Sequence, residues 1–118
     1  MKLVVQIPCY NEEATIGETI AQIPRQISGI EQVEVLVIDD GSTDQSVQRA
    51  KEAGADHIIK LKSRKGLAQA FMAGIEKALE LGADIVVNTD ADNQYPGDEI
   101  PRLIEPVLKG EAQLVVGK

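Results

Sequence analysis

The residues best suited to chemistry are two aspartates one position apart, Asp90 and Asp92. They follow an apolar, β-branched run that begins at Ile85 and has the character of a buried strand. At the end of a strand, two such carboxylates can turn their oxygens toward one point. Mg²⁺ and Mn²⁺ prefer oxygen ligands and keep positions open for substrate phosphates. Acidic residues also cluster in solvated turns, so this stretch alone leaves both a metal site and a solvated turn open.

A second acid pair, Asp39 and Asp40, follows another apolar run at Val33–Ile38. One of two adjacent aspartates at the end of a strand must leave the strand axis near the edge of the sheet. Basic residues gather further along, before Gly66, and they are Lys60, Lys62, Arg64 and Lys65. This basic loop is either solvated or forms a cationic lip over a phosphate site, since it lies between an expected strand and an expected helix.

Strands and helices that alternate along the chain must position these residues. Strands are predicted at Leu3–Ile7, Val33–Ile38, His57–Leu61, from Ile85 onward, and at Gln113–Val116. Apolar residues three and four apart predict helices between them, with inward faces at Ile16, Ile20, Ile23 and Ile27, at Val47, Ala50 and Ala53, from Leu67 to Leu79, and within 97–109. The pattern predicts an α/β fold, a Rossmann-like three-layer α/β/α arrangement with a mostly parallel sheet.

Ligands bind such sheets at the carboxyl edge, where the strands end. The polar clusters after the first, second, third and fourth strands all fall at that edge, and this shared position favours a binding site there. Asn11 is expected to cap the first helix, with Glu12 and Glu13 in its first turn, and Ser42 or Thr43 to cap the second. His57, the only histidine, is expected at a strand end on the surface.

Composition narrows the possible functions. The chain has 118 residues, enough for one domain, and its net charge of -7 argues against nucleic acid as a partner. The single cysteine, Cys9, is expected to be a small buried side chain. A membrane-spanning helix needs about 20 consecutive apolar residues, and no run in the sequence approaches that length, so we expect a cytoplasmic location. G-x-G-x-x-G and G-x-x-x-x-G-K-[ST] are both absent, which argues against dinucleotide and P-loop sites.

Four motifs occur in order along the chain, and they are Ile7–Glu13 (IPCYNEE), Val37–Asp44 (VIDDGSTD), Lys65–Ala68 (KGLA) and Thr89–Pro96 (TDADNQYP). Together they resemble the motifs of the inverting family 2 glycosyltransferases of GT-A fold. The likeness is greatest to the branch that contains the dolichol-phosphate mannosyltransferases and related polyprenyl-phosphate sugar transferases. It extends over nearly the whole chain.

The resemblance implies a nucleotide-sugar donor site. The nucleotide-binding residues that it implies are Pro8, Tyr10, Glu12, Asp39, Asp40, Lys65 and Asp90. The ligands that it implies for Mg²⁺ or Mn²⁺ are Asp90, Asp92 and Gln94. By this likeness Asp40 accepts a hydrogen bond from the base, and Lys65 or Arg64 assists the departure of the diphosphate.

Members of the family continue beyond the fifth strand with an acceptor-binding half. We therefore expect residues 1–118 to be a donor-binding domain truncated before that half, which binds a UDP- or GDP-sugar and is inactive alone. A longer parent would use a polyprenyl-phosphate acceptor at the cytoplasmic membrane face. In the family, an antiparallel strand from the acceptor-binding half pairs beside the fourth strand. Without that strand we expect an open sheet edge there, and self-association of the chain through it.

Alternatives from other classes remain. A response-regulator receiver, which is a phosphorylation switch of similar length, carries its acid pair after the first strand, where this chain has Tyr10-Asn11-Glu12. A nucleotidyltransferase on a related fold usually has a turn rich in glycine and arginine at that place. A non-catalytic nucleotide-binding or self-assembling module would fit the same residues.

Overall fold

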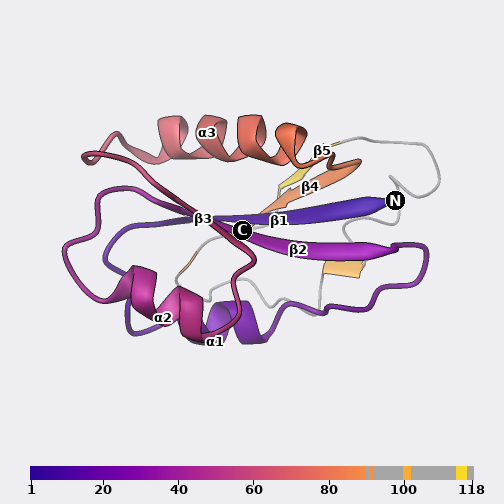
Figure 1. Ribbon diagram of the computed structural model, residues 1–118, viewed down its shortest axis with the longest axis horizontal. Coiled ribbons are helices and arrows are strands. Elements are labelled where there is room, and N and C mark those ends of the chain that lie inside the picture. The colour runs from indigo at the N-terminus through magenta and orange to yellow at the C-terminus, as the bar shows by residue number, and fades with distance from the viewer. Residues whose placement is uncertain (90, 92–99, 102–113, 117–118) are drawn as a thin grey trace.

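The chain forms a parallel sheet between two layers of helices. The computed structural model describes residues 1–89, 91, 100–101 and 114–116. Its elements are β1 (Lys2–Cys9), α1 (Ile16–Ala21), β2 (Gln32–Asp39), α2 (Ser46–Glu52), β3 (His57–Lys60), α3 (Leu67–Glu80), β4 (Ile85–Asn88) and β5 (Leu114–Val116). The five described strands pair in parallel, in the order β3-β2-β1-β4-β5. α3 covers one face, and α1 and α2 cover the other (Figure 1). The predicted α/β/α fold is confirmed; most of the helix expected at 97–109 lies outside the described residues.

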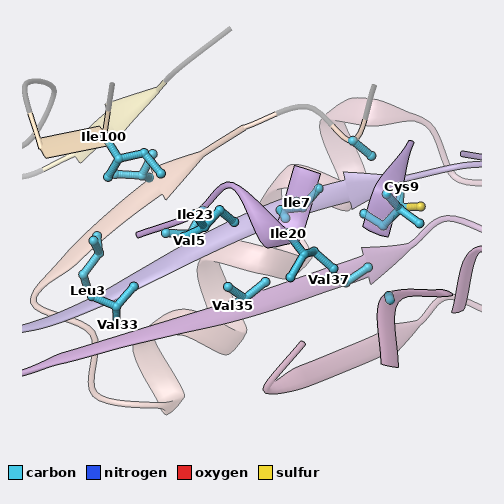
Figure 2. Packing of buried hydrophobic residues seen from close by; sticks show 14 of the residues in the cluster. Leu3, Val5, Ile7, Cys9, Ile20, Ile23, Val33, Val35, Val37 and Ile100 are labelled. Atoms are coloured by element: carbon cyan, nitrogen blue, oxygen red, sulfur yellow. The ribbon is translucent and has the colours of Figure 1, made fainter. Parts of the chain in front are cut away.

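β1 is the central strand and is buried from Leu3 to Cys9. Because side chains alternate across a strand, its two faces join two separate cores. The core on the α1 side gathers β-branched and aliphatic side chains (Figure 2), among them Leu3, Val5, Ile7, Ile20, Ile23, Val33, Val35, Val37 and Ile100. A strand that is covered on both faces must be apolar on both faces. The first apolar run meets this requirement, and it forms the centre of the sheet.

α1 is shorter than the isoleucine spacing predicts. It ends at Ala21, whereas the predicted apolar face continues to Ile27. Pro24 accounts for the early end, because proline disfavours a helical conformation in the residue before it and cannot donate a backbone hydrogen bond. Ile23 and Ile27 are nevertheless buried in the same core. Their predicted burial is confirmed, and the long helix is wrong.

α3 packs on the sheet through its smallest residues. Ala70, Gly74 and Ala78 are its buried positions. Leu67 and Leu79, which were expected to face inward, are each 65% exposed. The buried stripe is narrower than the apolar spacing suggests because the helix lies close to the sheet, where only small side chains fit.

Gly74 permits this close approach. Gln6 is fully buried beneath the helix, and its Nε2 donates to Asn88 Oδ1 at 2.9 Å and to the carbonyl of Phe71 at 3.3 Å. A Cβ placed on Gly74 would lie 2.5 Å from Gln6 Oε1 and 2.8 Å from Ile38 Cδ1. Neither neighbour can move freely, since one is hydrogen-bonded and the other is packed in the core.

We expect Gly74→Ala to lower the free energy of unfolding by about 1–3 kcal/mol, the usual cost of overpacking a core. Alanine is intrinsically the better helix former by roughly 1 kcal/mol, so a loss of stability reports packing and not helix propensity. Urea denaturation followed by circular dichroism measures the change, with Gln69→Ala on the exposed side of α3 as the control. A variant as stable as the parent would contradict the close approach.

An ionic cluster lies near the amino-terminal ends of the first three strands. Glu34 Oε1 accepts from Lys2 Nζ at 3.1 Å and from His57 Nε2 at 3.0 Å. His57 begins β3, at a strand end as expected, and has this carboxylate as its partner. Desolvation raises the pKa of Glu34, but the hydrogen bonds from His57 and Lys2 outweigh it and lower the pKa below its ordinary value of 4.5.

Glu34→Gln should therefore lower the free energy of unfolding at pH 7, by no more than about 1 kcal/mol because the cluster is partly solvated. A depressed folded-state pKa gives stability that is present above pH 4.5 and is lost as the pH falls through the lower, folded-state pKa. Melting temperatures of the two proteins, measured from neutral pH downward, should converge in acid. A difference in melting temperature that is larger in acid than at neutral pH would contradict this role of Glu34.

The edge of β4 is occupied. β5 pairs parallel to β4, with Leu114 opposite Val86 and Val116 opposite Asn88. The expected open edge beside the fourth strand is therefore wrong, because backbone groups on that side of β4 pair with β5. Within the described residues the outer strands are β3 and β5. Self-association of the chain stays a prediction.

Candidate functional site

A cleft of about 370 Å³ opens at the carboxyl edge of the sheet. The ends of β1 and β2, the segments after β3 and β4, and the first turns of α3 contribute its lining residues, which are Pro8, Cys9, Tyr10, Glu12, Asp40, Arg64, Leu67, Ala70 and Ala91. The structure thus brings together four of the predicted nucleotide-binding residues, Pro8, Tyr10, Glu12 and Asp40. Their roles stay predictions.

Asp40 holds the basic loop against the sheet. Its carboxylate is buried, and Oδ1 accepts from the Lys65 amide at 2.6 Å while Oδ2 accepts from the Gly66 amide at 3.0 Å. Gly41 packs against the same loop, since a Cβ there would lie 2.8 Å from Arg64 N. Gly41 also has φ of +81°, which other residues rarely adopt. Asp40 therefore fixes one wall of the cleft, and its predicted contact with a base stays a prediction.

Arg64, rather than Lys65, lines the cleft. Its guanidinium carbon lies 3.8 Å from the centre of the Tyr10 ring, which is a cation–π contact. Lys65 is exposed and gives its backbone amide to Asp40. The cluster of basic residues in the sequence left a solvated loop and a cationic lip open, and the loop conformation decides which side chain reaches the cleft. A guanidinium can both stack on a ring and donate to a phosphate.

Asp39 is buried beside the cleft. It is 5% exposed; its Oδ2 accepts from the Ser42 amide at 3.3 Å, and Oδ1 has no partner among the described residues. Cys9, opposite Asp39 in the sheet register, is 2% exposed. Burial raises the pKa of the Cys9 thiol to about 11 against a hydrogen bond with Ser46, and the charge of Asp39 adds to the rise. The thiol is therefore protonated at neutral pH, as its expected packing role requires.

We expect Cys9 in the folded protein to react with iodoacetamide at pH 8 about 100-fold more slowly than in the urea-unfolded chain, because burial suppresses both access and the thiolate. Mass spectrometry of timed samples gives both rates, and Cys9→Ser reports any reaction at other side chains. Equal rates in the folded and unfolded chains would show that the thiol is accessible.

Hydrogen bonds join the loop after β1 to the loop after β2. The Asn11 amide donates to Ser42 Oγ, and the Thr43 amide donates to Asn11 Oδ1, both at 2.8 Å. Asn11 has φ of 50°, a left-handed conformation that asparagine tolerates. The predicted capping roles are wrong, because α1 begins after Thr15 and α2 after Gln45. The three predicted capping residues bind across the loops instead.

The same junction includes both glutamates of the first motif. The Glu12 amide donates to Ser46 Oγ at 2.8 Å, and the Glu13 amide donates to Asp44 Oδ2 at 3.2 Å. Desolvation raises the pKa of Asp44, but hydrogen bonds from Ser46 and from the Glu13 amide outweigh it and lower the pKa. Glu12 and Glu13 were expected in the first turn of α1. Both glutamates instead precede α1. The carbonyl of Glu12 accepts from the amides of Thr15 and Ile16, which forms a turn just before the helix.

Ala91, the residue between Asp90 and Asp92 in the acidic stretch Asp90–Gln94, is bound to the start of α1. Ala91 is 3% exposed and lines the cleft. Its carbonyl accepts from Thr15 Oγ1 at 2.7 Å and from Thr19 Oγ1 at 3.2 Å. Neither threonine stands out in the sequence, since nothing local distinguishes them from other polar residues at the start of a helix. The predicted metal ligands that lie outside the described residues are Asp90, Asp92 and Gln94.

The predicted ligand set fits a hard divalent cation. Two carboxylates and one amide supply only oxygen donors, which suit Mg²⁺ or Mn²⁺. Across residues 1–89 and the other described positions, no group of three or more His, Cys, Asp or Glu side chains could hold an ion. The metal assignment therefore depends on the acidic turn.

Known proteins resemble the chain over almost its whole length. The family described as Glycosyl transferase family 2 matches residues 4–118. A dolichol-phosphate mannosyltransferase of Pyrococcus furiosus is 35% identical over 93% of this chain and 31% of its own length. An undecaprenyl-phosphate mannosyltransferase of Micrococcus luteus is 33% identical over 99% of this chain and 48% of its own length. The chain thus spans less than half of these curated relatives.

Solved structures share the fold. One is a glucosyl-3-phosphoglycerate synthase from Mycobacterium tuberculosis in complex with Mn²⁺, uridine diphosphate and glucosyl-3-phosphoglycerate. It matches with a TM-score of 0.74 at 31% identity, over 93% of this chain and 40% of that chain. The GT-A-type fold that the four motifs predict is confirmed.

Proposed function

Because this chain belongs to glycosyl transferase family 2, we propose that it forms the nucleotide-sugar-binding part of an inverting, metal-dependent glycosyltransferase. The donor is a UDP- or GDP-sugar, and the acceptor of the whole protein is a polyprenyl phosphate. The observation that carries the proposal is the cleft at the carboxyl edge, where the loops after four strands meet.

Pro8, Tyr10 and Glu12 would form the nucleoside end of this cleft. A nucleobase is flat and carries hydrogen-bond donors at its edge. The face of the Tyr10 ring away from Arg64 offers a flat surface, and the carboxylate of Glu12 offers acceptors. Each oxygen of Asp40 accepts one backbone amide and has a second lone pair for a base. Asp39 would support Asp40 from the adjacent position in the chain.

The diphosphate would lie toward Arg64 and the acidic turn. Arg64 reaches the cleft from the basic loop, and the exposed Lys65 can add positive charge at its rim. Held by Asp90, Asp92 and Gln94, a Mg²⁺ or Mn²⁺ ion would stabilise the negative charge that develops on the leaving diphosphate. The protein's own contribution is to bind the donor and orient its sugar–phosphate bond.

The acceptor is proposed from the names of the two curated relatives, which specify dolichol and undecaprenyl phosphates. A phosphate oxygen is already nucleophilic and needs positioning more than deprotonation. Since this chain spans less than half of those relatives, we assign it donor binding and assign transfer to the whole protein. We place the whole protein at the cytoplasmic face of the membrane that holds the acceptor. Among its described helices, none has the length and apolar character to cross a bilayer.

A receiver-type phosphorylation switch fits the geometry less well. The acid pair Asp39–Asp40 lies at the end of β2, and residues 10–12 follow β1. Both oxygens of Asp40 also accept backbone amides, which leaves this carboxylate poorly placed to receive a phosphoryl group.

Thermal shift with UDP, GDP and their sugars, with and without Mn²⁺, tests the proposal. A ligand at 100 times its dissociation constant adds about 2.7 kcal/mol of stability, so a bound nucleotide should raise the melting temperature measurably, and more so with Mn²⁺. If no nucleotide shifts the melting temperature in the presence of metal, the donor-site proposal fails. Stabilisation by beryllofluoride with Mg²⁺ alone would favour a receiver instead.

Two variants separate the ends of the cleft. Asp92→Asn should remove the metal-dependent part of the shift. Asp40→Asn should weaken nucleotide binding about tenfold even without metal, because it loses a charged acceptor that fixes the basic loop. Glu76→Gln, on the exposed side of α3, makes the same change of charge and should alter neither. Equal effects of the first two variants would show that these roles are assigned wrongly.

A further inference from the structure

Two threonine hydroxyls converge on one backbone carbonyl next to the cleft. Thr15 Oγ1 and Thr19 Oγ1 lie 2.7 Å and 3.2 Å from the carbonyl oxygen of Ala91, which is 76 and 72 positions away in the chain. Thr19 and Ala91 are each 3% exposed, so water cannot readily replace the hydrogen bond between them, whereas Thr15 is half-buried. Covalently, Ala91 is the link between Asp90 and Asp92.

Each hydroxyl has a second possible acceptor. Thr15 Oγ1 also lies 3.2 Å from Glu12 Oε2, and Thr19 Oγ1 lies 3.0 Å from the carbonyl of Thr15. A hydroxyl carries one proton, so each can donate to only one partner at a time. With two donors available, the Ala91 carbonyl keeps a partner even when Thr15 turns its proton toward Glu12.

A purely local role explains only part of this arrangement. A threonine in a helix commonly donates to the carbonyl four residues earlier, and the contact of Thr19 with Thr15 is of that kind. That habit does not bring both hydroxyls to one distant carbonyl. Two valines would fill the same volume without binding Ala91, so the hydroxyls specify the position of the Ala91 carbonyl.

We propose that Thr15 and Thr19 are positioning residues for metal binding: they fix the Ala91 peptide at the cleft and thereby hold the backbone from which Asp90 and Asp92 extend. Thr15 also links this turn to Glu12 at the nucleoside end. The inference rests on the proposed function, because it concerns the divalent cation that accompanies a nucleotide. Partners that orient metal ligands typically change metal affinity by about 10–100-fold when they are removed.

The test measures Mn²⁺ affinity by the electron paramagnetic resonance signal of free Mn²⁺, in the presence of UDP, and UDP affinity in EDTA. Thr15→Val with Thr19→Val should weaken Mn²⁺ binding by about 10–100-fold. Thr19→Val alone should show a smaller loss and should leave UDP affinity in EDTA within about twofold of the parent, since Thr19 does not contact Glu12. Thr19→Ser, which keeps the hydroxyl, should restore Mn²⁺ affinity.

Glu34→Gln, in the ionic cluster at the opposite end of the sheet, serves as a control that loses stability away from Thr15, Thr19 and Ala91. If it loses Mn²⁺ affinity as strongly as the valine variants, the effect is general destabilisation and the inference is overturned. Unchanged Mn²⁺ affinity in the double valine variant also overturns it, while the proposed function stands. If the parent binds neither UDP nor Mn²⁺, the proposed function itself fails and the inference falls with it.

Discussion

The candidate site depends on the register of β1 between two parallel neighbours. β1 pairs with β2 so that Cys9 lies opposite Asp39, and with β4 so that Gln6 lies opposite Asn88. β1 and β2 therefore end together, β4 ends opposite Gln6 on the same edge of the sheet, and the chain leaves each strand with polar residues that cannot return to the core. The cleft lies where these segments share one edge of the sheet. Strand pairing, rather than any single motif, therefore determines which residues line the cleft.

The polar groups at this edge bind one another across the loops. Asp40 accepts two amides of the basic loop, Asn11 bridges to the loop after β2, and the carbonyl of Ala91 accepts two hydroxyls of the α1 region. Each contact joins segments far apart in sequence. A pocket whose walls are already fixed loses little conformational entropy on binding, which suits the recognition of a flexible, charged donor.

The fold was predictable because its signals are local. Apolar runs with the period of strands, alternating with the three- and four-residue spacing of helices, gave the order of elements, and paired acids at strand ends located the edge that carries the cleft. The predictions that were wrong concern residues whose positions depend on contacts with segments far away in the sequence. Asn11 has the side chain of a helix cap but binds Ser42 and Thr43 across the loop, and Leu67 is exposed at the start of α3, beside the cleft. Thr15 and Thr19 carry no signal of their own in the sequence, and the cluster of basic residues does not single out Arg64 from Lys65.

Backbone amide NMR during titration with UDP and Mg²⁺ tests the central claim most directly, because it locates the ligand as well as detecting it. We predict shifts concentrated at the carboxyl edge, at Tyr10, at Lys65 and Gly66, and at Ala91, with little change around Glu34 and His57 at the opposite end of the sheet. The shifts at Ala91 should depend on the metal. Binding that leaves the amides of the cleft unchanged, or no binding at all, would contradict the assignment of this edge as a nucleotide-sugar site.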